Sequence, residues 1–254
     1  MTKALVNGPA KLGATSWGCA YCHLPTGKGR PENAPVAGQS VAYFLRQLED
    51  FRNDARTSAD PRKPNTPMMV GLAKAMTEEE MKETAEYFAA MKWTPWTRVI
   101  ETALVPKTRI EGNLFLPTEK ALTEPIAGRI IEVPEDQEQS EDLRNPRSGF
   151  IAYVPIGSIS RGKKLAKTLA CATCHGPDLM GLVDVPGIAG RSPSYLVRQL
   201  YDFQTGTRKG SSSAQMQPVV ANLSADDMVA IAAYVTSRGP RGKTSLDSGT
   251  RHVQ

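Results

Sequence analysis

The chain repeats itself. A shift of 152 positions aligns Cys19–Arg56 with Cys171–Arg208 without a gap, and 16 of the 38 aligned residues are identical. The first copy then has five extra residues within positions 57–67, after which a shift of 147 restores the match, beginning with Met69 and Met216. This is an internal duplication, so the chain is expected to fold as two similar units rather than as one large domain.

Both copies begin with the pattern C-x-x-C-H, at Cys19–His23 and at Cys171–His175. On one helical turn, residues i, i+3 and i+4 lie on the same face. Two thiols can therefore add to the vinyl groups of one haem while the adjacent histidine ligates its iron. The sequence predicts two covalently bound haem c groups. Thioether bonds are expected at Cys19, Cys22, Cys171 and Cys174, and iron ligation at His23 and His175.

Other roles for these cysteines account less well for the spacing and the adjacent histidines of the two motifs. A zinc site built from two such pairs closes a short loop, whereas 149 positions separate Cys22 from Cys171. A thioredoxin-like dithiol requires a βαβ context, which neither neighbourhood shows. A disulfide within each pair leaves the adjacent histidines unexplained.

The repeat also nominates a second axial ligand for each iron. Met69 and Met216 occupy one aligned position ahead of the last helix of each copy. Methionine is more often a core residue, and Met68 competes with Met69, but the alignment favours Met69. A thioether ligand raises the potential relative to bis-histidine ligation and closes the iron to small substrates. Apart from the two haem histidines, the sequence holds only His252, so a histidine base beside an open iron would have to be that residue.

Each copy is predicted to consist of helices joined by loops, which makes the fold class all-α. Serine and threonine precede the apolar periodic segments, as they do at helix N-termini, and two of them stand three residues before an acidic residue, which is typical of a capping box. The predicted caps are Ser40, Ser192 with Pro193 after it, Thr77 with Glu80, and Ser224 with Asp227. Positions 57–67 are polar and proline-rich and are expected to form a loop.

Residues 10–95 and 156–238 resemble the diheme class I cytochromes c, especially the tandem cytochrome c-four type. The resemblance rests on C-x-x-C-H, then Ala-Gly-Gln or Ala-Gly-Arg, then Tyr-x-x-x-Gln-Leu-x-x-Phe, then the methionine before the last helix. It implies all-α domains, His-Met ligation, maturation in the periplasm, and one-electron transfer to or from larger redox complexes.

The resemblance further implies a set of residues near the haem edges or propionates, for which capping and surface solvation are the alternative. They are Tyr43, Gln47, Arg56, Tyr195, Gln199 and Arg208. It also points to Pro35 and Pro186 as the proline whose carbonyl orients the haem histidine. These two are one position out of alignment, because Pro35 pairs with Gly187.

The two copies are separated by a long insert, whereas the c-four type has a short linker. The expected division is a first haem domain at 1–95, the insert at 96–155, a second haem domain at 156–240 and a polar tail at 241–254. Residues 129–133 and 149–154 are predicted to be short extended pieces in an otherwise mostly irregular insert. The insert could cover the first domain, bridge the two domains, or dock a partner.

The net charge of +5 is unevenly distributed, at +2 before residue 96, −3 in the insert and +6 after it. A basic second half could steer the protein towards an acidic redox partner, although solubility explains the charge equally simply. No motif indicates nucleic-acid binding, no apolar run has transmembrane length, and no signal peptide is present. Since haem attachment of this kind implies export, the chain is expected to begin near the mature N-terminus of a periplasmic protein.

The sequence therefore predicts a soluble diheme electron carrier in which no residue acts as acid, base or nucleophile. Its expected partners are redox proteins such as a dehydrogenase, an oxidase or a bc-type complex; its oligomeric state is open. One alternative is a fixed haem subunit of a dehydrogenase or oxidase complex, with the insert as docking element. Another is a diheme enzyme of the peroxidase or thiosulfate dehydrogenase type, which the lack of spare cysteine and histidine disfavours.

Overall fold

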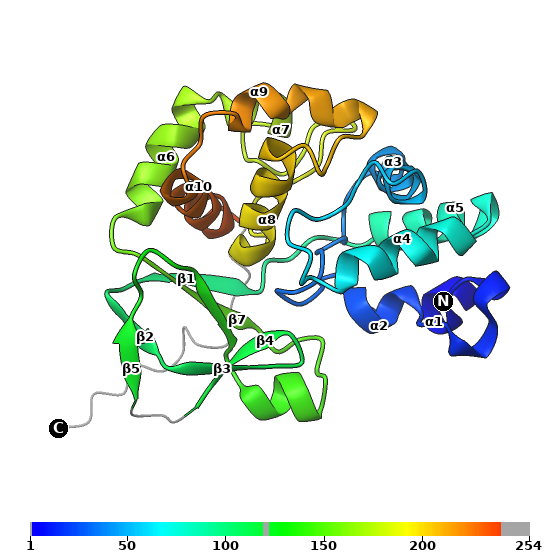
Figure 1. Cartoon of the computed structure of the whole chain (residues 1–254), viewed down its shortest axis with the longest axis horizontal. Coiled ribbons are helices and arrows are strands. Elements are labelled where there is room, and N and C mark those ends of the chain that lie inside the picture. The colour runs from blue at the N-terminus through cyan, green and yellow to red at the C-terminus, as the bar shows by residue number, and fades with distance from the viewer. Residues whose placement is uncertain (1, 119–121, 240–254) are drawn as a thin grey trace.

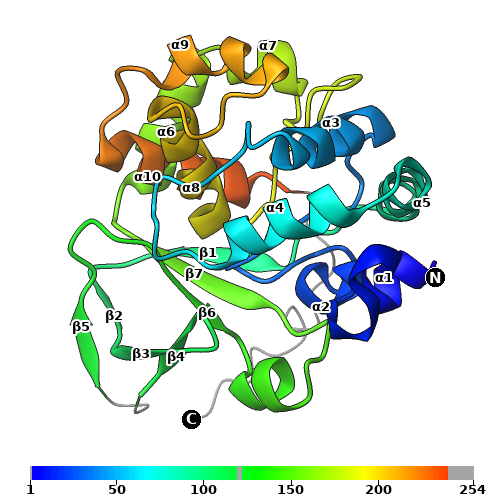
Figure 2. The ribbon, with the colours of Figure 1, turned by 45° about the vertical axis from the view of Figure 1, so that its right-hand side comes forward.

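The protein is built from two helical units and a layer of strands. The computed structural model describes residues 2–118 and 122–239, so the predicted tail at 241–254, with His252, lies outside the described residues. The helical units lie beside each other, and the strands lie along one side of both (Figures 1 and 2). Within the described ranges, no helix is both long enough and apolar enough to cross a membrane.

The first helical unit spans six helical segments. They are α1 (Lys3–Asn7), η1 (Ala10–Thr15), α2 (Cys19–His23), α3 (Val41–Arg52), α4 (Asn65–Ala75) and α5 (Glu78–Ala89). The predicted caps are confirmed: Ser40 accepts a hydrogen bond from the Tyr43 amide, and Thr77 forms a capping box with Glu80. Burial of apolar side chains from α1, α3, α4 and α5 gives the unit one core, centred on Phe88.

The second helical unit repeats this plan. Its elements are α6 (Ser158–Thr168), α7 (Cys171–His175), α8 (Pro193–Gln204), η3 (Ser211–Gln215), α9 (Gln217–Val220) and α10 (Ala225–Ser237). Ser192 and the capping box of Ser224 with Asp227 begin α8 and α10, as predicted. Helices α6 and α10 pack closely at Gly162, where an added Cβ would lie 1.9 Å from the Ala230 carbonyl oxygen. Glycine at this point sets the distance between the two helices.

The insert is a β-structure, so the prediction of a mostly irregular segment is wrong, and all-α describes the helical units but not the whole chain. The strands are β1 (Thr97–Glu101), β2 (Leu104–Pro106), β3 (Thr108–Glu111), β4 (Leu114–Pro117), β5 (Thr123–Pro125), β6 (Ile131–Pro134) and β7 (Phe150–Val154). The two predicted extended pieces became β6 and β7, which pair antiparallel, and β1 pairs parallel with the other edge of β7. Strands β2 and β5 form a second ladder and β3 and β4 a hairpin.

The insert contacts both helical units and so bridges them. On the second unit, the buried Glu132 of β6 accepts a hydrogen bond of 2.7 Å from the hydroxyl of Ser192, at the start of α8. On the first unit, Arg30 forms an ion pair of 2.9 Å with Glu141, which lies in a short π-helix (η2, Glu138–Asp142). Of the three roles considered for the insert, the contacts favour bridging.

Candidate functional site

The two motif histidines are held in the same way. Each C-x-x-C-H forms a single helical turn, α2 or α7. Nδ1 of His23 lies 2.8 Å from the carbonyl oxygen of Ala34, and Nδ1 of His175 lies 2.8 Å from that of Pro186. A carbonyl can only accept, so Nδ1 carries the proton and Nε2 keeps its lone pair for a metal. Burial lowers the pKa of both imidazoles, which favours the neutral ligand form.

The carbonyl prediction is confirmed for Pro186 and wrong for Pro35. The first histidine uses Ala34, the residue that aligns with Pro186 at a shift of 152. The requirement is for a carbonyl at one backbone position, whichever side chain that residue carries. Alignment therefore locates the acceptor better than residue type does.

Cavities lie against both motifs. In the second unit, a cavity of about 400 Å³ is lined by Cys171, Cys174, His175 and Met216. In the first unit, cavities of about 110 and 50 Å³ both reach His23 and Met69, and Cys19 and Cys22 line the smaller one. In each unit two thiols, an imidazole and a thioether thus border the same space, as a covalently bound haem with two axial ligands requires.

The methionine candidates are placed differently by the structure. Met69, in α4, lines both cavities of the first unit, whereas Met68 reaches only the smaller one and is 37% exposed. Met216 is the single residue that joins η3 to α9. Met69 instead lies within the regular helix α4, which aligns with the segment that the second copy divides into η3 and α9.

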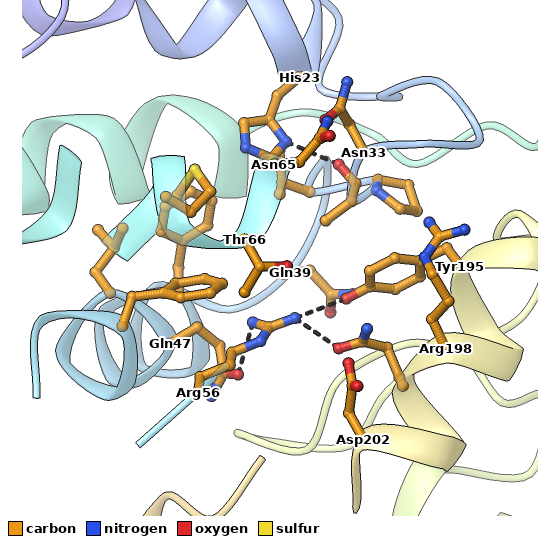
Figure 3. A pocket seen from close by; sticks show the side chains of 18 of the residues that line it. His23, Asn33, Gln39, Gln47, Arg56, Asn65, Thr66, Tyr195, Arg198 and Asp202 are labelled. Atoms are coloured by element: carbon orange, nitrogen blue, oxygen red, sulfur yellow. Dashed lines mark hydrogen bonds between the residues drawn. The ribbon is translucent and has the colours of Figure 1, made fainter. Parts of the chain in front are cut away.

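The six predicted haem-edge residues form one hydrogen-bonded network between the two units. Arg56 donates to Oε1 of Gln47 at 2.8 Å, to Oε1 of Gln199 at 2.7 Å and to the Tyr195 hydroxyl at 3.1 Å (Figure 3). Arg208 makes the mirror-image contacts, with Gln199, Gln47 and Tyr43 at 3.0, 2.7 and 3.0 Å. Both arginines are buried, so surface solvation, the alternative considered for this set, is wrong for them.

This network is rich in buried positive charge. The six hydrogen bonds that Arg56 and Arg208 donate within the network go to four uncharged oxygens. Nε of Arg46, of Arg198 and of Arg208 is buried without a hydrogen-bond partner among the described residues, and all three arginines line the cavities. Buried cations require nearby anions, and the two carboxylates of a haem supply them. The residues present therefore fit haem at both sites.

Sequence reasoning missed two functional candidates at one aligned position, Gln39 and Arg191. Arg191 is buried and donates to the carbonyl oxygens of Pro35 at 2.7 Å and Ala37 at 3.0 Å. Gln39 exchanges two hydrogen bonds with the backbone of Gly187. The signal was present in the motif Ala-Gly-Gln or Ala-Gly-Arg, where a long polar side chain follows two small residues.

Comparison with known proteins agrees with this geometry. The cytochrome c family model matches residues 10–92 and again residues 159–239. Cytochrome c4 of Pseudomonas aeruginosa is 25% identical over 222 residues, which cover 85% of this chain and 82% of that protein. The thiosulfate dehydrogenase electron acceptor of Stutzerimonas stutzeri is 25% identical over 226 residues, covering 88% of this chain and 80% of that protein.

Solved structures show the same fold. Reduced recombinant cytochrome c4 from Pseudomonas stutzeri superposes with a TM-score of 0.55 at 21% identity, covering 87% of this chain and 93% of that one. Thiosulfate dehydrogenase from Marichromatium purpuratum gives a TM-score of 0.56 at 24% identity, and the match covers 98% of this chain but 43% of that longer chain. With two family-model matches that cover more than half of its residues, each around one C-x-x-C-H motif, this chain belongs to the cytochrome c family and carries two haem c groups.

Proposed function

We propose that this protein carries single electrons between redox partner proteins, using two haems with His-Met ligation. The first haem is assigned to Cys19, Cys22, His23 and Met69, and the second to Cys171, Cys174, His175 and Met216. The observation that carries the proposal is the convergence, in each unit, of these four side chains on one cavity. A bound haem supplies a one-electron ferric/ferrous couple.

The protein's own groups fix the geometry of that couple. The Nδ1–carbonyl bonds hold each imidazole in one orientation and leave Nε2 free to ligate a haem iron. Met69 and Met216 line the same cavities and would supply the second ligand of each iron, which would disfavour chemistry on a small substrate. The cavity of about 110 Å³ in the first unit and the cavity of about 400 Å³ in the second share four lining residues, Tyr43, Gln47, Tyr195 and Gln199. The two haem sites therefore have a common wall through which an electron can pass.

The relatives suggest the class of partner. One curated relative is named as an electron acceptor of thiosulfate dehydrogenase, which favours a dehydrogenase as electron donor for this chain too. An oxidase or a bc-type complex fits the opposite role, and the periplasm is the compartment in which such exchange takes place. The basic second half would speed encounter with an acidic partner surface.

One observation favours a second role, as a fixed subunit of a larger complex. Ile110 and Leu104, on the strands of the insert, are 73% and 55% exposed. If these two side chains belong to one contiguous apolar patch, that patch would mark a protein contact. A partner that stays bound during purification at high salt would support the fixed subunit, whereas loss of the partner would support a mobile carrier.

The carrier function predicts no reaction with small ligands. Protein reduced with dithionite should be reoxidised rapidly by an oxidised redox partner and only slowly by peroxide, and carbon monoxide should leave its spectrum unchanged at neutral pH. The reason is that both irons are saturated by histidine and methionine. Stopped-flow absorbance tests this. Rapid carbon monoxide binding, or steady turnover of peroxide or thiosulfate, would show that the protein is an enzyme.

The potential of the first haem should depend on pH because of Glu32. This carboxyl lines the cavity beside His23, and burial raises its pKa to about 7, although Arg30 Nε lies 3.1 Å from its Oε1. Ferric iron adds positive charge and so favours the carboxylate. The potential should therefore fall as pH rises through the pKa, by roughly 30 mV if the two iron states differ about threefold in proton affinity.

Redox titrations between about pH 6 and 8 measure this slope. Lys63 and Glu141 also face Glu32, and burial lowers the pKa of Lys63 to about 8. Glu32→Gln should flatten the low-pH part of the curve of first-haem potential against pH. Lys63→Met should leave the slope in that pH range in place. A slope that is unchanged in Glu32→Gln would assign it to another group.

A further inference from the structure

The contacts of Gln39 and Arg191 cross between the units and end beside the carbonyls that orient the haem histidines. In the second unit, His175 bonds to the Pro186 carbonyl, and the next residue is Gly187. The Gly187 amide donates to Oε1 of Gln39 at 3.0 Å, and Nε2 of Gln39 donates to the Gly187 carbonyl at 2.9 Å. All of these groups except the Gln39 side chain belong to the second unit.

The Pro186 carbonyl and the Gly187 amide are the two ends of one peptide group. When the amide donates a hydrogen bond, electron density shifts to the carbonyl oxygen, which becomes a stronger acceptor. A stronger acceptor pulls harder on the Nδ1 proton of His175 and makes the imidazole a better electron donor to iron. Gln39 therefore acts on the second iron through a continuous chain of hydrogen bonds.

The first unit cannot do the same. Its matching peptide joins Ala34 to Pro35, and proline has no amide hydrogen. The residue that reaches across is Arg191, which donates to the Pro35 carbonyl instead. Thus the aligned residues Gln39 and Arg191 each contact the other unit, but with different chemistry. Only the Pro186–Gly187 peptide, which orients His175, can be polarised through its amide from the other unit.

We propose that Gln39 is a positioning residue that lowers the reduction potential of the second haem by polarising the Pro186–Gly187 peptide, and so makes the two haems inequivalent. The second haem then favours the ferric state more than its own unit alone would dictate. The packing supports a well-defined contact, because Gln39 is buried and both polar ends of its amide are hydrogen-bonded to Gly187.

The test is Gln39→Met, a neutral replacement of similar length that can neither accept from nor donate to Gly187. In the full-length haem-loaded protein, the ferrous-to-ferric ratio of the second haem at a fixed applied potential should rise about threefold. This equals roughly 30 mV for a one-electron couple, since a tenfold change corresponds to 59 mV. The first haem, whose proximal peptide has no amide hydrogen, should move by much less.

Proton NMR of the His175 Nδ1–H gives a second readout, because a weaker acceptor shifts that resonance upfield in the ferrous protein. Arg191→Met is the control for opening the same interface. It keeps both Gln39–Gly187 hydrogen bonds, including the one to the Gly187 amide, and removes the bond that Arg191 Nε donates to the Gly187 carbonyl. Loss of the positive charge of Arg191 should lower the potential of the second haem, which is opposite to the rise expected for Gln39→Met.

A second variant, Gln39→Glu, keeps a hydrogen-bond acceptor at residue 39 and adds a negative charge to it. It should lower the potential of the second haem by more than it lowers the potential of the first haem.

An unchanged second potential in Gln39→Met, equal shifts of both haems, or a rise in Arg191→Met as well would overturn the inference. The inference rests on the proposed ligation of the second haem by His175. If that assignment were wrong, the His175 resonances of the unsubstituted ferric protein would lack a paramagnetic shift. Failure of the Gln39 inference alone would leave that shift intact.

Discussion

Replacing Met216 with alanine should remove the weak near-infrared sulfur-to-iron band of the second haem and lower its potential by on the order of 0.2 V, within the roughly 0.8 V range that axial ligands control. Met69→Ala should have the same effect on the first haem. The physical reason is that thioether sulfur stabilises ferrous iron and that its loss admits water or another donor. Near-infrared absorbance and spectroelectrochemical titration measure both effects, and carbon monoxide should bind the opened haem.

Met68→Ala is the matched control for the first site. Met68 and Met69 are adjacent, but Met68 is the more exposed and borders only one of the two cavities. Its replacement should preserve the band and the potential. If Met68→Ala lost the band and Met69→Ala kept it, the assignment from the repeat would be reversed.

Arg191→Met should destabilise the folded protein by about 3 kcal/mol, the scale expected when buried polar groups lose their partners. The Arg191 side chain is 2% exposed, and its guanidinium stacks 3.9 Å from the ring centroid of Trp93. It donates to the carbonyls of Pro35, Ala37 and Gly187. Methionine fills much of the same volume but leaves the Pro35 and Ala37 oxygens without this donor between the units, while the Gly187 oxygen keeps its bond from Gln39. The midpoint of denaturant unfolding, followed by haem absorbance, measures the loss.

Arg161→Met is the corresponding surface control. Arg161 forms an ion pair with Asp227 and is about half exposed, so its removal should cost less than about 1 kcal/mol. Equal losses for the two variants would mean that the contacts of Arg191 between the units contribute little to stability.

The parts of the fold that follow local rules could be predicted from the sequence. Ser40 and Ser192 cap helices because their hydroxyls reach an amide three residues on, and that chemistry depends on the immediate neighbours alone. The repeat pairs Met69 with Met216, and both side chains line cavities beside the motif histidines, since duplicated sequences share a backbone course.

The insert could not be predicted in the same way. Its strands are three to five residues long, and pairing across distant segments, as between β1 and β7, leaves no local trace. One signal was available: Gly112 and Asn113 both have positive φ, of 55° and 66°, and form a two-residue turn between β3 and β4. The hydrogen-bond partners of Gln39 and Arg191 could not be predicted from the sequence either, because they depend on how one unit packs against the other.

The contacts between Arg56 and Arg208 have a consequence for the symmetry of this chain. Each arginine bonds the glutamine of its own unit and both the glutamine and the tyrosine of the other, and the two backbones pair antiparallel at these residues. Mutual contact of equivalent residues characterises an isologous homodimer interface. A single unit with this surface would be self-complementary, so the duplicated chain holds inside one polypeptide the two-fold arrangement of an isologous dimer. The differences at Gln39 and Arg191, together with the insert, break that symmetry between the two units.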